Sequence, residues 1–341
     1  MYTSEFWFDL PERLIARRPI EPRDHCRLMV IDRATGRIEH TRFDELFRWI
    51  SQEDLLILNN TRVLPARLSA DDGAVEILLL QETSPLHWLA IGRPGSKLKA
   101  QRRLHLDPVH PVQSGATGKK RVEVEILKTL PSGERVICFF EPIDLHAYGR
   151  LPLPPYIEEA RVKSGEAVIQ PCDADWYQTA YAEVDGSVAA PTAGLHFTPE
   201  LLTQFNHAFI TLHVGLGTFR PIKTENIEEH VMQEESYSIP AGLRQKAAAA
   251  RRVVAVGSTV ARVLETEPTL QPGSGTTRLF IRPPYPFKHV DAMITNFHLP
   301  GSTLLVMIAT FMGIELQRKA YREAIEKEYR FYSYGDAMLI L

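Results

Sequence analysis

The segment 186–220 carries the residues of this chain that are best suited to chemistry. Two apolar, strand-like runs, 187–190 and 208–214, each lead into a loop of Gly, Thr or Pro that holds one histidine, His196 or His213. Small residues at the end of a strand let a ligand approach the backbone, because no side chain stands in the way. A histidine beside such a loop can accept or donate a proton near neutral pH. The segment therefore predicts a pocket for a small polar ligand next to acid–base groups.

A third histidine, His298, lies in a similar apolar segment beside Pro and Gly residues. Any one of the three could be a structural core histidine whose hydrogen bonds are satisfied. Their shared setting nevertheless predicts that at least one of them transfers protons. Their wide spacings match no compact ligand motif and the chain has no HExxH sequence, so we predict no metal site.

A candidate anion-binding motif, Gly257-Ser258-Thr259, follows a predicted strand and opens a predicted helix. Free N–H groups and hydroxyls at the start of a helix favour a carboxylate or a phosphate. Ordinary capping of the helix would use the same residues. The motif lacks both the Walker lysine and the GxGxxG spacing, and Gly215 with Gly217 likewise makes only a partial glycine loop.

Basic residues gather between positions 92 and 121, where eight Lys or Arg residues accompany a single acid, Asp107. Such a strip suits electrostatic contacts with phosphates, although a solvated loop surface has the same composition. The aromatic run 329–336 contains Tyr334 and Asp336. Its rings could stack on a base or could equally pack in the core.

The elements that must position these groups alternate between strands and helices, which predicts an α/β fold built on a large mixed sheet. We expect buried strands at 54–59 and 253–256 and helices at 241–252 and 310–327. The C-terminal segment 334–341 ends in an apolar run, which predicts a last strand tucked into the core.

The segment 63–149 has a different texture. Short alternating or apolar runs are separated by turn residues and no convincing helix is present, which indicates a small β-barrel or sandwich. We therefore predict a β-barrel-like domain at 63–149, inserted into a discontinuous α/β catalytic domain that comprises 1–62 and 150–341.

Two junctions in the large domain are unusually short. The helix expected to begin at Thr198 nearly reaches the strand at Ala208, and the helix expected to end at Arg252 runs directly into Val253. Helices normally need a capping residue and a short connection before a strand begins. Either these turns are tight or residues are missing from the sequence there.

The composition is that of a globular protein with no overall attraction to nucleic acid. The chain has 341 residues, 44% hydrophobic content and a formal net charge of −3, so any such attraction must come from local patches. Three cysteines without a CxxC pair indicate neither a disulfide framework nor a cysteine zinc site. The longest apolar run, 303–314, is too short to span a bilayer, and the N-terminus is not a secretory signal. We expect a cytoplasmic location.

Nine segments together resemble the S-adenosylmethionine:tRNA ribosyltransferase-isomerase family of queuosine biosynthesis. The similarity runs nearly end to end, several segments are long and specific to that family, and the basic strip matches least. The segments are FDLPERLIA (8–16), RDHCRL (23–28), NNTRVLPARL (59–68), PLPPYI (152–157), YQTAYAE (177–183), GSVAAPTAGLHFT (186–198), TLHVGLGTFRP (211–221), TNFHLPGSTL (295–304) and YRFYSYGDAMLI (329–340).

The resemblance implies that the chain transfers and isomerises the ribosyl part of S-adenosylmethionine, which is a consumed substrate, so no separate cofactor is expected. The implied acceptor is 7-aminomethyl-7-deazaguanine at the tRNA wobble position, and the implied products are epoxyqueuosine-tRNA, adenine and methionine. A base must remove a proton beside the sulfonium, and a proton donor must help adenine to leave. The expected partners are therefore tRNA and S-adenosylmethionine, with no membrane, and we expect a monomer.

This resemblance also suggests roles for the residues noted above. His196, His213 and His298 are expected to transfer protons, and Asp336 to orient a group or contact a base. The residues expected to bind S-adenosylmethionine are Thr192, Gly194, Gly215, Gly217, Gly257, Ser258, Thr259 and Arg262. Those expected to bind tRNA are Lys97, Lys99, Arg102, Arg103, Lys119, Lys120 and Tyr334.

The chain departs from the family pattern in two motifs. Gln233 stands where the pattern H-x-M-H-x-E has its second histidine, and Val260 replaces the Ser of G-T-T-S-V-R. Two alternatives therefore stay open beside the leading hypothesis: an S-adenosylmethionine-dependent tRNA methyltransferase, and a tRNA-binding homologue that has lost catalysis.

Overall fold

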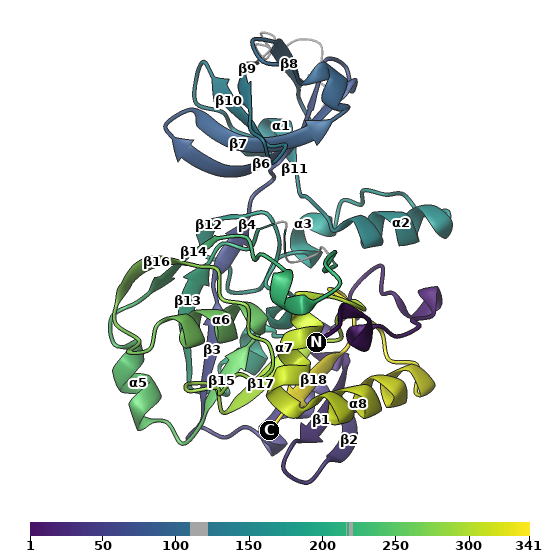
Figure 1. Cartoon of the computed structure of the whole chain (residues 1–341), viewed down its shortest axis with the longest axis vertical. Helices are drawn as coiled ribbons and strands as arrows, with labels where there is room; N and C mark the ends of the chain where they lie inside the picture. Colours follow the sequence, from purple (N-terminus) through teal and green to yellow (C-terminus); the bar gives the residue numbers. More distant parts are fainter. Residues whose placement is uncertain (110–121, 216, 218–220) are drawn as a thin grey trace. The chain divides into compact units, whose positions relative to one another are not determined.

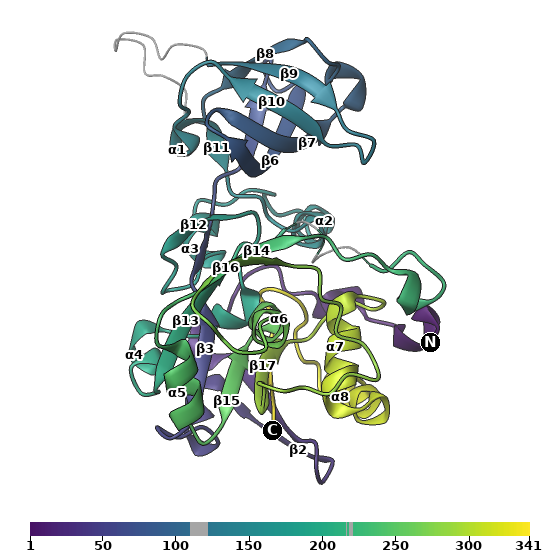
Figure 2. The same cartoon turned by 60° about the vertical axis from the view of Figure 1, so that its left-hand side comes forward.

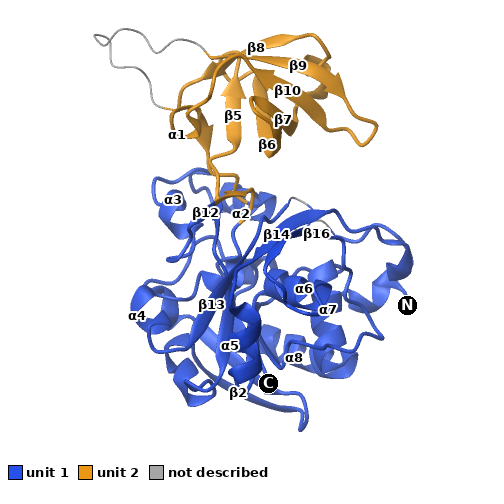
Figure 3. Ribbon diagram, turned by 90° about the vertical axis from the view of Figure 1, so that its left-hand side faces the viewer, with its two compact units in different colours: residues 1–62, 154–184, 190–341 blue, residues 63–153, 185–189 orange. Residues whose placement is uncertain are grey.

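The computed structural model describes residues 1–109, 122–215, 217 and 221–341, which form two compact units (Figure 3). The first unit comprises residues 1–62, 154–184 and 190–341, and the second comprises 63–153 and 185–189. Residues 150–153 and 185–189, which the sequence analysis placed in the α/β domain, thus group with the second unit. Among the described residues, no helix is both long and apolar enough to cross a membrane.

A mixed sheet forms the centre of the first unit (Figure 1). Within the described residues it has nine strands, in the spatial order β16 (Gly273–Thr277), β14 (Glu235–Ile239), β13 (His207–Leu212), β3 (Leu55–Asn59), β15 (Val253–Val256), β17 (Ala292–Asn296), β18 (Ala337–Ile340), β1 (Arg27–Asp32) and β2 (Arg37–Arg42). Strands β13, β3, β15 and β17 run parallel to one another. The C-terminal strand β18 lies between β17 and β1, which confirms the predicted buried position of the chain end.

The helices of the first unit differ from the sequence prediction most clearly at 310–327. They are α2 (Pro155–Lys163), α3 (Asp173–Trp176), α4 (Pro199–Leu202), α5 (Leu243–Ala249), α6 (Ser258–Thr266), α7 (Thr303–Met312) and α8 (Ile314–Glu326). Short 3₁₀ helices lie at Thr3–Phe6, Glu12–Leu14, Arg23–His25, Phe43–Arg48, Thr192–Gly194 and Ile227–Glu229. The single helix predicted at 310–327 is wrong, because Gly313 adopts a φ of 88° and separates α7 from α8.

The core of the first unit lies on both faces of the sheet. All five residues of β3 are buried, as expected of a parallel strand that is covered on both sides. On one face Leu56 and Leu58 pack with Phe197, which precedes α4, and with Leu201, which belongs to α4. Helices α6, α7 and α8 cover the opposite face (Figure 2).

At both junctions that looked too short, the helix ends earlier than predicted and leaves residues for a turn. Helix α4 ends at Leu202 and α5 ends at Ala249, so residues 203–206 and 250–252 are free to make the turns. In the second turn, Arg252 donates through Nε to Asp54 Oδ1 at 2.9 Å, which holds the connection against the start of β3. The chain therefore makes both turns with connections of ordinary length.

The strand predicted at 187–190 is present only at its beginning. Strand β12 covers Val184–Ser187 and pairs with β4 (Thr61–Val63), and the following residues leave the ladder. Ser187 Oγ donates to Ala189 O at 2.7 Å, a local side-chain bond that competes with strand pairing. The strand therefore ends where this local bond begins.

The second unit is a small antiparallel barrel, which confirms the predicted fold class. In its described part six strands close on themselves, because β5 pairs with both β6 and β8. The strands, in spatial order, are β5 (Arg67–Ala70), β6 (Val75–Ser84), β7 (His87–Arg93), β10 (Arg135–Phe139), β9 (Glu123–Thr129) and β8 (Arg103–Asp107), with β11 (Gly149–Arg150) beside β5, a 3₁₀ turn at Gly95–Lys97 and helix α1 (Leu145–Tyr148). Along β8 and β9 the burial alternates, with Leu104 and Val124 inside the barrel and Arg103 and Glu125 outside.

Candidate active site

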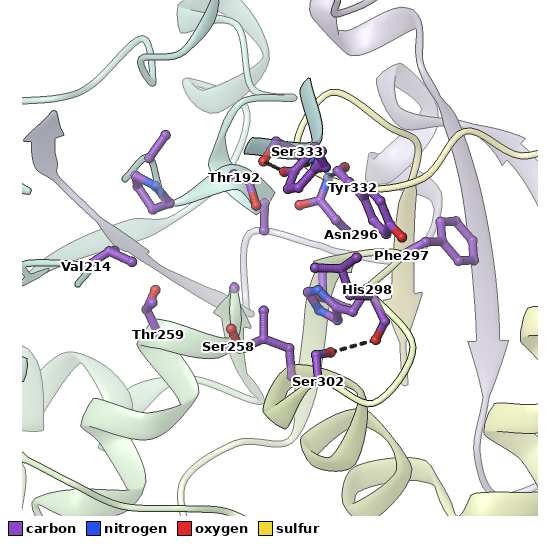
Figure 4. Close-up of a pocket in the computed structure, with 18 residues that line it drawn as sticks. Thr192, Val214, Ser258, Thr259, Asn296, Phe297, His298, Ser302, Tyr332 and Ser333 are labelled. Carbon is purple, nitrogen blue, oxygen red and sulfur yellow. Dashed lines mark hydrogen bonds between the residues drawn. The ribbon is translucent and has the colours of Figure 1, made fainter. Parts of the chain in front are cut away.

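A cavity lies in the first unit, at the edge of the sheet where β15 and β17 end. Because parallel strands end at the same edge, the loops that follow them lie close together, and Gly257 N donates to Ile294 O at 2.8 Å. The cavity measures about 620 Å³ including the open solvent at its mouth. Its polar lining comprises Tyr156, Thr192, Ser258, Thr259, Thr295, Asn296, His298, Ser302 and Ser333 (Figure 4).

The start of helix α6 forms one wall of this cavity. Gly257 has a φ of 95°, which a residue with a side chain would adopt only under strain, and a Cβ there would lie 3.5 Å from the Cβ of Ala193. The turn brings Gly257, Ser258 and Thr259 to the cavity. The first N–H groups of a helix favour an anion. The predicted anion-binding motif therefore lies where a ligand can reach it, and its role in binding stays a prediction.

His298 lies in the loop after β17, on the cavity wall (Figure 4). Its Nε2 is 2.7 Å from Thr295 Oγ1, and its backbone N–H donates to the Tyr321 hydroxyl at 3.0 Å. Burial lowers the pKa of His298 to about 3, so the imidazole is neutral near pH 7. Among the described residues no hydrogen-bond partner occupies Nδ1, which leaves this nitrogen for a ligand.

His196 lies behind the cavity wall rather than on it. Its Nδ1 is 3.2 Å from Cys26 Sγ, and its Nε2 is 3.0 Å from Nδ2 of Asn296, which does line the cavity. Burial lowers the pKa of His196 to about 3, with further contributions from the positive charges of Arg330 and Arg23. A neutral imidazole in this position can act on a ligand of this cavity through Asn296.

Aromatic and hydroxyl groups form the opposite part of the lining, and the sequence analysis did not assign them to the site. The hydroxyls of Tyr156 and Ser333 are hydrogen-bonded to each other, and Ser333 N donates to the Tyr156 hydroxyl at 3.2 Å. The rings of Tyr156 and Tyr332 lie 4.7 Å apart in an edge-to-face arrangement. Burial raises the pKa of both phenols. A usable signal existed, because these residues lie in the segments PLPPYI and YRFYSYGDAMLI.

His213 lies beside the cavity lining without being part of it. Its Nδ1 is 2.8 Å from Thr61 Oγ1, and its backbone N donates to Ser236 O at 3.1 Å. The next residue, Val214, does line the cavity. The structure therefore brings the loop after β13 to the site, but the lining includes the valine and not the histidine.

Arg262 is paired within the protein. Its guanidinium forms an ion pair with Glu235, both side chains are about 5% exposed, and Glu235 Oε1 also accepts from Gly215 N at 3.0 Å. Burial lowers the pKa of Arg262 to about 10. A Cβ on Gly217 would lie 2.8 Å from Gln233 Oε1. These residues form a second cluster, and the structure does not include them in the cavity lining with Ser258 and His298.

Asp336 also lies outside the lining residues. Its carboxylate accepts from Arg27 N at 3.0 Å and from Arg330 N at 2.8 Å, and it pairs with the Arg27 guanidinium at 3.1 Å. Gly194, a further predicted ligand contact, lies against the Tyr181 hydroxyl, which a Cβ would overlap. Both residues are thus engaged by the protein itself.

The predicted tRNA-binding residues of the barrel are partly neutralised by their neighbours. Arg102 pairs with Asp71 at 3.1 Å. Arg103 pairs with Glu125 at 3.4 Å and lies 3.7 Å from Glu123. A paired surface cation can still meet a phosphate, but it must exchange one partner for another.

The other members of that set have varied positions. Lys97 donates weakly to Ala74 O at 3.5 Å, and Lys99 is exposed. Tyr334 belongs to the first unit and is buried, and its hydroxyl has no partner among the described residues. Lys119 and Lys120 lie outside the described residues. Within the described part of the chain, no group of three His, Cys, Asp or Glu side chains is arranged to hold a metal ion.

Comparisons with known proteins show where the chain belongs. The family model described as "Queuosine biosynthesis protein" matches residues 3–340. The S-adenosylmethionine:tRNA ribosyltransferase-isomerases of Thermotoga maritima and Caldanaerobacter subterraneus are 45% and 44% identical to the chain, and each alignment covers 100% of both proteins.

A solved structure agrees with these relatives. The crystal structure of an S-adenosylmethionine tRNA ribosyltransferase from Thermotoga maritima matches with a TM-score of 0.53 and 36% identity, over 99% of this chain and 100% of that one. The resemblance inferred from the nine sequence segments is thereby confirmed. The chain belongs to the queuosine biosynthesis protein family.

Proposed function

We propose that this chain is an enzyme of queuosine synthesis, which transfers and isomerises the ribosyl moiety of S-adenosylmethionine onto a tRNA base. The observation that carries the proposal is its similarity, over the full length, to relatives that are named for this reaction. At the finer level, we propose 7-aminomethyl-7-deazaguanine at the wobble position as the acceptor. Epoxyqueuosine-tRNA, adenine and methionine are then the products.

The cavity offers groups for the steps that this reaction needs. The start of α6, with Ser258 and Thr259, suits the methionine carboxylate, because N–H groups and hydroxyls there favour an anion. The Arg262 guanidinium is less suited, because Glu235 already neutralises it.

His298 is the best placed of the predicted proton carriers. Its neutral imidazole lines the cavity, and Nδ1 has no partner among the described residues, so this nitrogen can take the proton from the carbon beside the sulfonium. Adenine needs a proton as it leaves. If His298 delivers the proton it has taken, it ends the reaction neutral, and its buried site does not have to hold a lasting charge. The geometry supports His298 in this role more directly than His196, His213 or Asp336.

Gln233 and Val260, the two departures noted for the loss of a histidine and of a hydroxyl, are not part of the cavity lining. Val260 is fully buried in α6, and the Gln233 side chain lies against Gly217. Neither is among the described residues that line the cavity. This placement supports an active enzyme over a homologue that only binds tRNA.

The proposal extends to the setting in which the enzyme works. We propose that S-adenosylmethionine and tRNA are its partners, that it acts as a monomer in the cytoplasm, and that it needs no separate cofactor. S-adenosylmethionine supplies both the ribosyl group and the leaving groups, so no further reactant is required to balance the transfer. Gel filtration with light scattering measures the oligomeric state directly.

One labelling experiment tests the proposed activity. The protein is incubated with tRNA that carries 7-aminomethyl-7-deazaguanine and with S-adenosylmethionine labelled in either the ribose or the methyl group. Ribose label in the tRNA, with release of free adenine, supports the proposal. Methyl label in the tRNA would instead identify a methyltransferase, and tRNA binding without any label would identify an inactive homologue. The same tRNA with guanine at the wobble position is the control and should stay unlabelled.

A further inference from the structure

Three side chains from distant parts of the chain form a continuous row that ends at the cavity. Cys26 Sγ lies 3.2 Å from His196 Nδ1, and His196 Nε2 lies 3.0 Å from Asn296 Nδ2. Thiol, imidazole and amide are the groups of a cysteine nucleophile with its base and orienting residue. The direction of the hydrogen bonds decides whether this row can have that function.

The backbone carbonyl of Tyr332 fixes that direction. A carbonyl oxygen only accepts, and it lies 3.2 Å from the side-chain nitrogen of Asn296. The amide nitrogen must therefore face this carbonyl, because the opposite orientation would set two oxygens against each other. The same nitrogen faces His196, so it donates to Nε2 as well. Nε2 then carries no proton, and the proton of the neutral imidazole lies on Nδ1 and points towards Cys26 Sγ.

This arrangement is the reverse of a nucleophilic triad. In such a triad the imidazole removes the thiol proton and donates its other N–H to the oxygen of the amide. Here the amide donates to the imidazole, so protonation of His196 at Nε2 would break the bond to Asn296. Cys26 is only 2% exposed, and burial, together with the charge of Asp336, raises the pKa of its thiol. The row does not generate a thiolate.

The amide oxygen of Asn296 is the group left over. The two amide hydrogens are used by His196 and by the Tyr332 carbonyl, whereas Oδ1 has no partner among the described residues. Asn296 is 1% exposed and lines the cavity beside Tyr332 (Figure 4). A buried acceptor without a partner is unfavourable by about 1–3 kcal/mol. A ligand that offers a hydrogen-bond donor to this oxygen removes that penalty.

We infer that Cys26 and His196 are positioning residues that hold the Asn296 amide with its oxygen in the cavity, where it accepts a hydrogen bond from an N–H or O–H group of the bound nucleoside. The inference rests on the proposed function, because S-adenosylmethionine is the nucleoside considered. The donors of its nucleoside part are the exocyclic amine of adenine and the ribose hydroxyls. Both sources share the same chemistry, and the test separates them.

The test compares binding of S-adenosylmethionine with that of analogues that each lack one donor. Calorimetry gives the Kd of the wild type and of Asn296→Ala for S-adenosylmethionine, for the analogue with a 6-oxopurine, and for the 2′-deoxy and 3′-deoxy analogues. We expect one analogue to bind the wild type about tenfold or more weakly. We expect Asn296→Ala to bind that analogue and S-adenosylmethionine equally. Equal losses in both proteins for every analogue, or no loss in the wild type, would overturn the inference.

A second measurement addresses the positioning residues without relying on activity. The ¹⁵N shifts of the His196 ring in the wild-type protein report which nitrogen carries the proton, and we expect Nδ1. A proton on Nε2 would contradict the inferred direction of the row. His196→Leu should lose the discrimination between S-adenosylmethionine and the sensitive analogue, whereas His207→Leu, in β13, should retain it. If His196→Leu does not fold, the ring shifts still decide the question.

These outcomes are separable from the fate of the proposed function. Wild-type protein that transfers ribose label, but shows no discrimination that depends on Asn296, contradicts only the inference. Wild-type protein that neither binds S-adenosylmethionine nor transfers label contradicts the proposed function.

Discussion

The cavity of the first unit and the basic strip of the barrel differ in whether their polar groups have partners within the protein. Around the cavity, Asn296 Oδ1 and His298 Nδ1 have no partner among the described residues, although both residues are almost fully buried. On the barrel, Arg102 and Arg103 are more exposed, yet each is paired with a carboxylate of the same unit. Among these four residues, the buried polar atoms are thus the ones without a partner in the described part of the chain, whereas the more exposed arginines have one.

This contrast indicates where a ligand gains most. A buried polar atom without a partner loses the hydrogen bonds it made in water, so a ligand that supplies a partner is strongly favoured. An exposed ion pair contributes little, and a ligand that replaces one partner gains little more. Substitutions at the cavity should therefore have larger effects on function than substitutions on the strip.

The largest effect is expected at His298. Replacement by Ala removes the proposed proton carrier, and we expect the rate of adenine release to fall about 10²- to 10⁴-fold. Single-turnover measurement of free adenine checks this, because product release does not limit it. His105→Ala, an exposed barrel residue, is the matched control. An unchanged rate in His298→Ala would show that the open nitrogen is not used in the chemistry.

Asp336 is a buried group that already has partners within the protein, so its replacement should affect stability rather than ligand binding. Asp336→Ala leaves the backbone N–H groups of Arg27 and Arg330 without their acceptor and removes the carboxylate that pairs with the Arg27 guanidinium. We expect the free energy of unfolding to drop by about 3–5 kcal/mol, measured by urea denaturation. Asp9→Ala, at an exposed position, should change it little. If Asp336→Ala retains full stability but loses adenine release, the carboxylate serves the reaction rather than the fold.

The sequence was sufficient to locate the cavity but not to assign its partners. Gly257 was found because it follows a predicted strand and opens a predicted helix, and His298 because it lies in an apolar segment beside Pro and Gly. The parallel strands β15 and β17 bring both to one edge of the sheet. The sequence could not show that Arg262 is paired, because its partner Glu235 lies in β14, whereas Arg262 lies in helix α6. The direction of the bond between Asn296 and His196 likewise depends on the carbonyl of Tyr332, which only the folded chain brings there.

The same limit applies to the fold. Apolar runs and alternating patterns predicted the mixed sheet and the inserted barrel, because a strand buried on both faces leaves an apolar run and a strand buried on one face leaves an alternating pattern. Helix ends were predicted less well. The break at Gly313 and the early end of α5 at Ala249 depend on local backbone geometry, and the apolar or alanine-rich pattern continues across both.

The two buried histidines should make stability depend on pH. Burial lowers the pKa of His196 and His298 to about 3, whereas an unfolded histidine titrates near 6.5. As the pH falls below about 6.5, the unfolded chain binds protons that the folded chain does not, so stability is lost between that pH and about 3. At pH 5 the loss is about 2 kcal/mol for each histidine.

Urea denaturation from pH 7 to pH 4 measures this slope. His298→Gln should remove the part of this pH dependence that comes from one histidine, whatever its effect on stability at pH 7. His105→Gln, on the barrel surface, is the control. A slope that His298→Gln leaves unchanged would mean that the ring is hydrated in solution, which would weaken the contrast between cavity and barrel.

The smallest effect is expected within the barrel itself. Lys99 and Arg103 belong to the same predicted tRNA-binding set, but Arg103 pairs with Glu125, whereas no ion pair of Lys99 is found among the described residues. If Lys99 contacts a phosphate, Lys99→Ala should weaken tRNA binding a few-fold and lower the slope of log Kd against log salt concentration by about 1. Arg103→Ala should change the slope less, because its charge is already balanced.

Filter binding over a series of salt concentrations gives both slopes, with Arg37→Ala on β2 as the control. Equal slopes for wild type and Lys99→Ala would assign the strip to ordinary surface solvation, and an equal reduction in both variants would show that tRNA displaces Glu125.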